Sequence, residues 1–394
     1  MRKSNVSGWL CFVVLFVGLS LNVPVGAAPT ITDLHSFQYA DGTDPNSLIE
    51  GSDGNFYGTT YWNGGSVFKI TPAGNFTLLY RFLPTNGKFL QGDYPVNVVE
   101  GPDGFLYGAA SSGGPNLGVG VAEPGNLFKV SKSGTGFQIV HAFCSAPSCS
   151  DGAEPTNLIL GSDGYFYGTT SGGGSFQGGC QYYGCGVMFR ISTDGTYTVL
   201  YTAQAGQIRL GGLMAATDGN FYATCSLAPA GHPGVCKVTP SLQVSSIFQF
   251  PSTLWPASIL TQGSNGLLYG SALVNPNSNS FQTIYQLSPS GGSFEQLFQT
   301  PIQCCVKIGY SRVIQASDGN LWITNPNAQL WGTVYSITPA GTLLRTIAFS
   351  GTNGHSPHYL IQASSGLLYG ATYSGGSYNY GTVFSIDAGL PPPK

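Results

Sequence analysis

The chain has 394 residues, and only 8% of them are charged, with 14 basic against 17 acidic side chains. Soluble proteins average about 25% charged residues. A surface so poor in lysine and arginine can neutralise few phosphates, so we expect no nucleic-acid partner. Aromatic residues make up 13% of the chain and must be buried or used for binding.

The first 27 residues predict a secretory signal peptide. Arg2 and Lys3 supply a positive start, an apolar run follows from Trp9 to Leu21, and Val25-Gly26-Ala27 offers a small-residue cleavage site. The apolar run is short for a membrane span, which needs about 20 residues. We therefore expect a secreted or periplasmic protein whose mature part, residues 28–394, is one domain, a monomer, and without a membrane span.

A repeated turn followed by an aromatic or leucine pair divides the chain into seven copies. Its versions are SDGNFYG, PDGFLYG, SDGYFYG, TDGNFYA, SNGLLYG, SDGNLWI and SSGLLYG, and their glycines are Gly54, Gly104, Gly164, Gly219, Gly266, Gly319 and Gly366. We call these seven stretches the marker turns. The marker glycines are 47 to 60 residues apart, and repeats of this length indicate a solenoid, a propeller or another array.

Each copy contains four short runs rich in Val, Ile, Tyr, Phe and Thr, which predicts four strands. In the first copy these are NSLIEG, NFYGTT, VFKIT and FTLLYRF, and the Asp-Gly turn between the first two is a strong hairpin signal. Four antiparallel strands repeated seven times predict an all-β, seven-bladed β-propeller. No long run has helical periodicity.

The N-terminal stretch ITDLHSF, residues 31–37, resembles the fourth strand of a copy, although no earlier strands precede it. The seventh copy ends at VFSIDAGL without a fourth strand of its own. We therefore expect residues 31–37 to complete the last blade and close the ring, which also covers an exposed strand edge. His35 and His141 align with fourth-strand aromatics, so we expect them to pack between blades or at the rim.

Eight cysteines remain after the leader, an even number that suits disulfides in an exported chain. Proximity in sequence suggests the pairs Cys144–Cys149, Cys180–Cys185 and Cys225–Cys236. The adjacent Cys304 and Cys305 could form a strained bridge, pair elsewhere or stay reduced, since spacing alone does not choose. No zinc-binding spacing is present, and we expect no cofactor or metal.

The string SDGNFYGTT…GG…VFKITPAGNFTLLYRF resembles the tandem repeat of the GloVer family of exported bacterial proteins, over residues 30–389. Copies one, two, three and seven share [DNQ]-G-x-x-P before the first strand, as in DGTDP at 41–45, and a Gly-Gly pair after the second. Copies four to six lack both. More faintly, residues 317–344 resemble a blade of virginiamycin B lyase, whose catalytic histidine and metal neighbourhood have no match here. That resemblance implies shared architecture only.

The long connections should all emerge on one face of the ring, which we call the loop face, because tight turns join strands one to two and three to four. Binding groups concentrate on such loops, and aromatic rings with polar tips suit a sugar, a peptide or an envelope polymer. The predicted binding residues are Tyr61, Trp62, Tyr94, Arg209, Trp255, Tyr310, Arg312, Trp331, His358 and Tyr380; Tyr182, Tyr183, His232 and Tyr378 lie in the same connections.

Acidic and histidine residues on these connections allow other chemistry. Asp41 with Asp44, and Asp151 with Glu154, could bind calcium, although a structural turn explains them better because other copies carry QGDY and NGHS there. His355 and His358 could act as a base or metal ligand, but no partner acid follows from spacing. No G-x-S-x-G elbow supports a serine triad, which is recognised by geometry.

The leading hypothesis is a non-catalytic binding or scaffold propeller that holds its ligand at the loop face. The competing hypothesis is a lyase or glycan hydrolase that uses acids and a histidine at the channel mouth; its candidates are Asp44, Asp93, Glu154 and His355. Two carboxyls about 5–9 Å apart would favour the hydrolase. A structural spacer or adhesin, without converging polar groups, is the third hypothesis.

Overall fold

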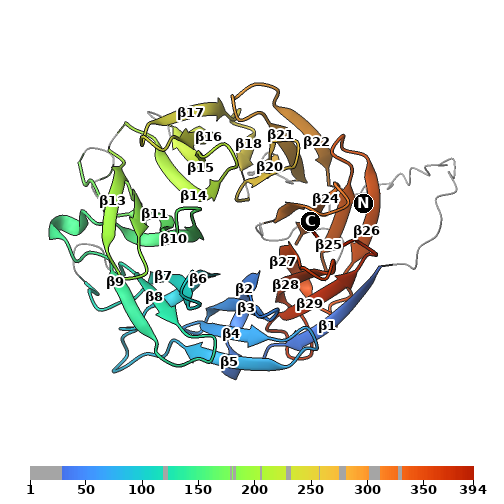
Figure 1. Cartoon of the computed structure of the whole chain (residues 1–394), viewed down its shortest axis with the longest axis horizontal. Helices are drawn as coiled ribbons and strands as arrows, with labels where there is room; N and C mark the ends of the chain where they lie inside the picture. Colours follow the sequence, from blue (N-terminus) through green and yellow to red (C-terminus); the bar gives the residue numbers. More distant parts are fainter. Residues whose placement is uncertain are drawn as a thin grey trace, which may run out of the picture.

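Seven antiparallel sheets form a closed ring around a central axis, which confirms the predicted seven-bladed β-propeller (Figure 1). The structure is a computed structural model that describes residues 29–118, 123–177, 180, 183–204, 206–227, 232–256, 258–274, 281–300, 311–326 and 331–394. The predicted signal peptide, Tyr182, Cys304, Cys305 and Tyr310 lie outside these residues. No helix in the described ranges is long and apolar enough to cross a membrane.

In blades 1 to 6 the strands follow chain order from the axis to the rim, and in blade 7 the order is β27, β28, β29 and then the N-terminal β1. Blades 1 to 3 consist of β2 (Thr43–Glu50), β3 (Phe56–Trp62), β4 (Ser66–Ile70) and β5 (Phe76–Arg81); β6 (Asp93–Glu100), β7 (Leu106–Ser112), β8 (Asn126–Val130) and β9 (Gln138–Ala142); and β10 (Ala153–Leu160), β11 (Phe166–Gly172), β12 (Val187–Ile191) and β13 (Tyr197–Thr202).

Blades 4 to 7 continue the pattern, with a first strand in two pieces in blade 5. They consist of β14 (Arg209–Ala215), β15 (Phe221–Leu227), β16 (His232–Val238) and β17 (Val244–Gln249); β18 (Leu254–Pro256), β19 (Thr261–Gln262), β20 (Leu268–Val274), β21 (Phe281–Leu287) and β22 (Glu295–Gln299); β23 (Val313–Gln315), β24 (Leu321–Asn325), β25 (Thr333–Ile337) and β26 (Leu343–Ala348); and β27 (His355–Gln362), β28 (Leu368–Ser374) and β29 (Thr382–Asp387). Two short 3-10 turns, η1 (Tyr39–Asp41) and η2 (Pro147–Cys149), lie between blades.

The N-terminal strand β1 (Thr30–Ser36) closes the ring. It pairs antiparallel with β29, from Thr30 opposite Asp387 to Ser36 opposite Thr382. The Phe37 N–H then donates to the Gly381 carbonyl, 3.0 Å away. The expected donation of the first strand to the last blade is therefore confirmed.

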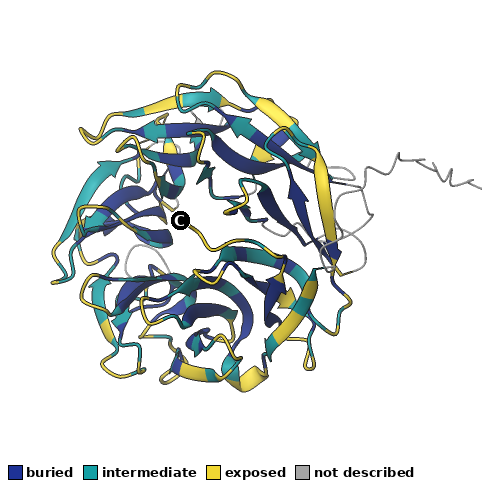
Figure 2. Cartoon of the chain, turned by 45° about the vertical axis from the view of Figure 1, so that its right-hand side comes forward, coloured by how far each residue is buried: buried dark blue, intermediate teal, exposed yellow. Residues whose placement is uncertain are grey.

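The hydrophobic core lies between neighbouring blades, and buried residues fill the inner strands while exposed ones gather at the rim and in the loops (Figure 2). At the junction of blades 1 and 2, for example, Tyr57 and Phe82 pack with Val98 and Phe128. The expectation that His35 and His141 pack between blades is also confirmed. His35 stacks on Phe76 of blade 1 with ring centroids 3.9 Å apart, and His141 stacks on Tyr197 of blade 3 at 3.7 Å.

The marker turns are structural. In the first, the Asp53 carboxylate accepts the Tyr57 hydroxyl at 2.7 Å, and Gly54 adopts φ of +73°, which glycine tolerates without strain. The same Asp–Tyr bond recurs at Asp103–Tyr107, Asp163–Tyr167 and Asp218–Tyr222. These turns define the turn face, opposite the loop face.

The [DNQ]-G-x-x-P stretches anchor the loop-face end of the first strand in blades 1, 2, 3 and 7. The residue before each proline has positive φ, and a bulge follows. These strands therefore begin earlier than the sequence predicts, so Asp44 and Tyr94 lie in strand ends rather than in loops. Proline is tolerated there because the innermost strand is an edge.

Candidate functional site

Three aromatic side chains meet on the loop face at the junction of blades 1 and 2. Tyr61 and Trp62 end β3, and Tyr94 lies near the start of β6. The rings of Tyr61 and Tyr94 stack with centroids 4.9 Å apart, and Trp62 stands nearly perpendicular to both, at 5.3 and 5.4 Å. Trp62 is 45% exposed. We call these residues the aromatic cluster.

The backbone beneath Tyr94 is held on both sides. Its N–H donates to the Asp93 carboxylate at 2.8 Å, and its carbonyl accepts the Ser111 hydroxyl at 3.1 Å. Its φ of +52° turns the chain into the inner strand, where Pro95 lies against Gly65 of blade 1. The sequence therefore places this ring through backbone geometry rather than through side-chain packing alone.

Two carboxyl groups flank the aromatic cluster. Asp93 is buried and pairs in register with Ser112 of β7, whose hydroxyl donates to Glu123. Burial, together with the nearby Glu123 carboxylate, raises the pKa of Asp93 to about 6. A carboxyl that titrates near neutrality beside an apolar surface can exchange protons with a bound molecule.

Two more predicted aromatic residues meet rings of the next blade. Trp331 lies 5.3 Å from the ring of His355, edge to face, and Ser374 Oγ lies 3.1 Å from His355 Nδ1. Burial lowers the pKa of His355, so it is neutral at pH 7. Tyr380 lies 6.1 Å from Tyr39 across the closure of the ring.

The predicted basic residues and Trp255 are scattered. Arg312 on blade 6 places its guanidinium 5.1 Å from the ring of Tyr359 on blade 7, and Arg209 on blade 4 donates to Cys180 Sγ at 3.7 Å. Trp255 on β18 is 47% exposed, and its indole N–H donates to the Ser252 carbonyl at 3.3 Å. None of these three side chains joins the aromatic cluster in the described contacts.

The predicted acidic candidates lie at different junctions. Asp93 is beside the aromatic cluster, Glu154 accepts the Ser171 hydroxyl at 3.0 Å in blade 3, and Asp44 faces His358 between blades 7 and 1. Asp41 and Asp151 each cap a turn. Asp41 accepts the Gln38 N–H at 3.0 Å, and Asp151 accepts the Ser145 N–H at 3.0 Å.

A structural turn therefore explains Asp41 and Asp151. Across the described parts of the chain, no group of three or more His, Cys, Asp or Glu side chains is placed to hold a metal ion. The three expected disulfides, Cys144–Cys149, Cys180–Cys185 and Cys225–Cys236, are formed.

Sequence reasoning missed Glu123 and Tyr39. Glu123 lies in the connection between the second and third strands of blade 2, and Tyr39 in the connection from β1 into blade 1. The rule that long connections carry binding groups could have found both. Neither belongs to a repeated motif, so nothing else in the sequence distinguishes them.

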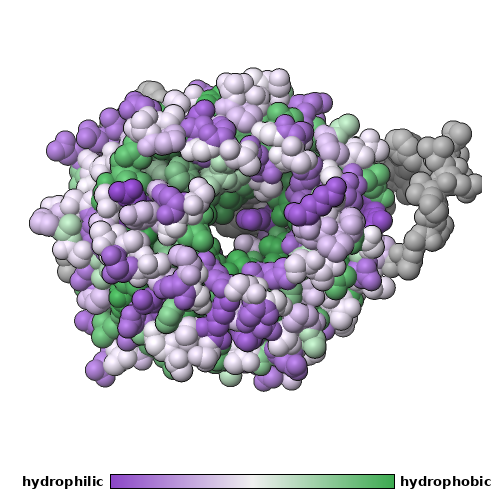
Figure 3. Space-filling view, in the orientation of Figure 1, coloured by the Kyte–Doolittle hydropathy of each residue, from purple (hydrophilic) through white to green (hydrophobic). Residues whose placement is uncertain are grey.

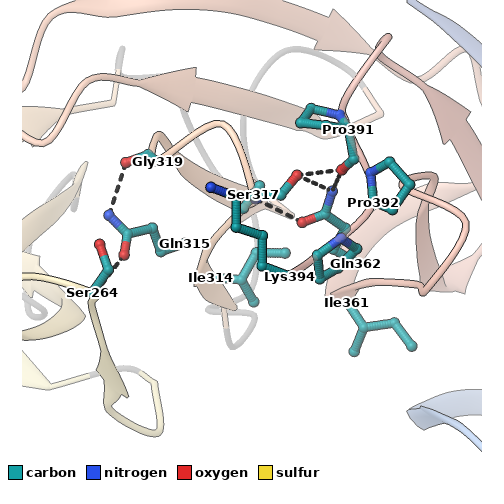
Figure 4. A pocket seen from close by; sticks show the side chains of 12 residues that line it. Ser264, Ile314, Gln315, Ser317, Gly319, Ile361, Gln362, Pro391, Pro392 and Lys394 are labelled. Atoms are coloured by element: carbon teal, nitrogen blue, oxygen red, sulfur yellow. Dashed lines mark hydrogen bonds between the residues drawn. The ribbon is translucent and has the colours of Figure 1, made fainter.

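The centre of the ring is hollow, with hydrophobic residues on its wall (Figure 3). On the turn face, a pocket of about 580 Å³ lies between the C-terminal tail and the inner strands of blades 5 to 7. The Pro391 carbonyl accepts the Ser317 hydroxyl at 2.5 Å and the Gln362 amide at 3.1 Å (Figure 4). This pocket is open and lies on the face opposite the aromatic cluster.

Comparison with solved structures shows the propeller fold. The ulvan lyase of polysaccharide lyase family 25 is 7% identical with a TM-score of 0.57, and 87% of this chain and 94% of that chain are covered. The hydrazine synthase of Kuenenia stuttgartiensis is 13% identical with a TM-score of 0.56, covering 87% and 96%. Oligogalacturonate lyase in complex with manganese is 14% identical at 0.53, covering 92% and 93%.

No curated protein matches the chain. A known family of repeat sequences does match the chain, over residues 23–182, 90–281 and 260–390, and these ranges together cover nearly the whole sequence. These overlapping matches agree with the repeat resemblance found in the residues. The chain belongs to the Gloeobacter/Verrucomicrobia repeat family.

Proposed function

We propose that this chain is an exported, non-catalytic binding propeller that holds a carbohydrate on the aromatic cluster of Tyr61, Trp62 and Tyr94. The observation that carries the proposal is the contact of three rings from two blades around a Trp62 side chain that is 45% exposed. A flat apolar ring with polar groups at its edge suits the C–H face and hydroxyls of a sugar.

Export rests on the signal-like leader and on the three disulfides, which persist in oxidising compartments. Carbohydrate rather than nucleic acid follows from the small number of basic residues. The carboxyls of Asp93 and Glu123 add hydrogen-bond acceptors beside the rings.

The test is a glycan array followed by titration calorimetry with the purified mature chain. We expect Trp62→Ala and Tyr94→Ala to weaken binding about tenfold each, since an aromatic stacking contact contributes about 1 kcal/mol beyond its buried area. Trp255→Ala is the matched control, because Trp255 has the same side chain and a similar exposure of 47% on blade 5. Unchanged affinity in Trp62→Ala would reject the proposal.

One observation favours a glycan hydrolase as a second candidate. Burial raises the pKa of Asp93 to about 6 beside the second carboxyl of Glu123, and a carboxyl that titrates near neutrality next to another suits the acid of a glycan hydrolase. Incubating the chain with each bound glycan and measuring new reducing ends separates the two functions. Turnover that is lost in Asp93→Asn would establish the hydrolase, and intact glycan would leave the binding function.

A further inference from the structure

Trp331 and Tyr380 occupy equivalent positions in blades 6 and 7. Each directly precedes the glycine before the third strand, and the carbonyl of each accepts the N–H of the residue before the next blade's proline. The Ser356 N–H reaches the Trp331 carbonyl at 2.9 Å, and the Asp44 N–H reaches the Tyr380 carbonyl at 3.1 Å. The backbone therefore presents both rings at the same place relative to the following blade.

The glycines after these rings fix the close approach of the blades. A Cβ on Gly332 would lie 2.3 Å from Pro357 Cδ, and one on Gly381 would lie 2.6 Å from Pro45 Cδ. Gly65 approaches Pro95 in the same way, with a Cβ distance of 2.3 Å. In blade 1 the equivalent position is Gly64, which has no ring. The exposed ring in that blade comes instead from Trp62, two residues earlier at the end of β3.

At each of these three consecutive junctions the ring meets an aromatic or imidazole ring of the next blade or of the connection that leads into it. The pairs are Trp331–His355 at 5.3 Å, Tyr380–Tyr39 at 6.1 Å and Trp62–Tyr94 at 5.4 Å. We call these six residues the aromatic arc. Its outward rings are exposed: Trp331 by 42%, Tyr380 by 37%, Tyr39 by 59% and Trp62 by 45%.

The next junction does not continue the pattern. In blade 2 the equivalent residue is Pro124, whose carbonyl still accepts the Glu154 N–H at 2.7 Å. In blade 3 it is Cys185, which is buried in a disulfide with Cys180. Blade 2 therefore keeps this backbone contact without an exposed ring, so the contact itself does not require an aromatic residue. The rings at three neighbouring junctions need another explanation.

The arc presents little positive charge. Arg81, beside Tyr39, keeps its positive charge, but its Nη1 and Nη2 groups donate to the carbonyls of Tyr39, Ala40 and Asn63 within the protein. His355 is neutral at pH 7 because burial lowers its pKa. Lys88, in the connection after β5, is exposed, whereas Lys69 and Lys132 lie over the Tyr57 ring at the turn face. Asp93 and Glu123 are negative groups at one end of the arc. This charge distribution disfavours an acidic polymer.

We propose that the aromatic arc is an extended binding surface for an uncharged, linear polysaccharide, whose sugar rings stack on the exposed rings of three successive blade junctions. The inference rests on the proposed carbohydrate-binding function and extends it from one cluster to a series of subsites. A polysaccharide offers flat C–H faces at regular intervals, which matches rings that recur once per blade.

The experiment measures the affinity of the mature chain for an uncharged β-linked glucan as a dimer and as progressively longer oligomers. We expect affinity to rise with length until the arc is filled. Trp331→Ala should weaken the longest oligomer about tenfold and leave the dimer unchanged, whereas Trp62→Ala should weaken both. Trp255→Ala is the control in blade 5, where the indole N–H donates to the Ser252 carbonyl and the ring belongs to none of the three pairs of the arc. Trp331→Leu keeps an apolar side chain without a ring if the alanine variant unfolds.

Equal affinity for oligomers of all lengths would overturn the proposed arc. It would also be overturned if both Trp331 variants bound the longest oligomer as tightly as the wild type does. Tighter binding of a polyuronate, or of an unstructured peptide, than of the glucan would also overturn it. The proposed function fails separately, by the absence of any carbohydrate binding or by an unchanged Trp62→Ala. A result in which Trp62→Ala weakens the dimer and Trp331→Ala changes nothing would keep the binding function and remove the arc.

Discussion

His358 of blade 7 faces Asp44 of blade 1, with His358 Nε2 3.8 Å from Asp44 Oδ1. At this junction, where the ring closes, Asp44 is buried and the His358 side chain is 15% exposed. Asp44 Oδ1 accepts no hydrogen bond from the described residues. Burial raises the pKa of Asp44 to about 8 and lowers the pKa of His358 to about 4. Between these values the pair holds one proton and carries no charge.

The equivalent residue of blade 1, Asn46, forms a neutral contact at the next junction, where its amide donates to the Pro95 carbonyl at 3.0 Å. The ring-closing junction thus contains a titratable side chain where its neighbour contains an amide. Folding stability should depend on pH through this pair, because both pKa values differ from their unfolded values of 6.5 and 3.8.

Asp44→Asn should become more stable relative to the wild type as pH rises. The folded pKa of Asp44 is raised, so this carboxyl contributes stability that is lost as pH rises from about 4 through about 8. Removing it should increase the relative free energy of unfolding by about 1.4 kcal/mol per pH unit over that window. Urea unfolding at a series of pH values checks this. A difference that is flat with pH would mean that Asp44 is ionised in the folded state.

His358→Asn should show the opposite slope. The folded pKa of His358 is depressed, so the unfolded chain binds more protons between about pH 4 and 6.5, and the wild type loses stability as pH falls through this range. The variant lacks that loss. It should therefore gain stability relative to the wild type as pH falls from 6.5 to 4. His355→Asn, on the same strand, is a comparison rather than a neutral control, because burial also lowers the pKa of His355 and its slope should have the same sign.

In the wild type the two contributions to the free energy of unfolding should cancel between about pH 4 and 6.5. As pH rises through this range, the contribution of Asp44 falls while that of His358 increases. Above pH 6.5 the slope from Asp44 remains, so this junction should weaken as pH rises toward 8. Comparison of the two single variants with the double variant measures the coupling between them. Full additivity across the pH range would mean that the two groups titrate independently.

Leu160 and Pro102 interrupt a series of contacts on the turn face. At five junctions the last residue of the first strand accepts the N–H of the preceding blade's marker turn, with distances of 2.6–2.8 Å; the pairs are Glu100–Ser52, Glu50–Ser364, Gln262–Thr217, Gln315–Ser264 and Gln362–Ser317. Pro102 has no N–H, and its counterpart Leu160 has no acceptor.

The double variant Pro102→Ser with Leu160→Gln should restore this contact. Each change alone leaves one partner missing, so we expect a coupling energy of about 0.5–1.5 kcal/mol in a double-mutant cycle of urea unfolding. The cycle also removes the separate effect of replacing proline on the unfolded chain. Simple additivity would show that the exposed contact contributes nothing measurable.

Phe37 tests the closure of the ring. It is fully buried beside Phe68 of blade 1, where the ring centroids are 5.1 Å apart. Phe37→Ala should cost about 3–5 kcal/mol, as for other buried phenylalanines. Phe82→Ala, also fully buried, is the matched control at an ordinary junction. A much smaller loss for Phe37→Ala than for Phe82→Ala, measured by urea unfolding, would contradict a closing role for this segment.

The number of blades, their strands and the closure by residues 31–37 could be predicted because they are written in local patterns. An Asp-Gly turn and alternating β-branched and aromatic residues act over a few positions. The seventh copy lacks a fourth strand and residues 31–37 are a fourth strand without a copy, which leaves one way to complete the ring. The disulfides could be predicted for the same reason, since Cys144 and Cys149 are close along the chain.

The candidate site depended on tertiary structure. Trp62 meets Tyr94, Tyr39 meets Tyr380 and Asp44 meets His358 only because neighbouring blades bring separate segments together, and nothing in the spacing of these residues encodes those meetings. Burial then sets the pKa values of Asp44, Asp93 and His358, and burial is a property of the assembled junction. The repeat determined the scaffold, and the packing of blade against blade decided which side chains share a surface and which titrate with a shifted pKa.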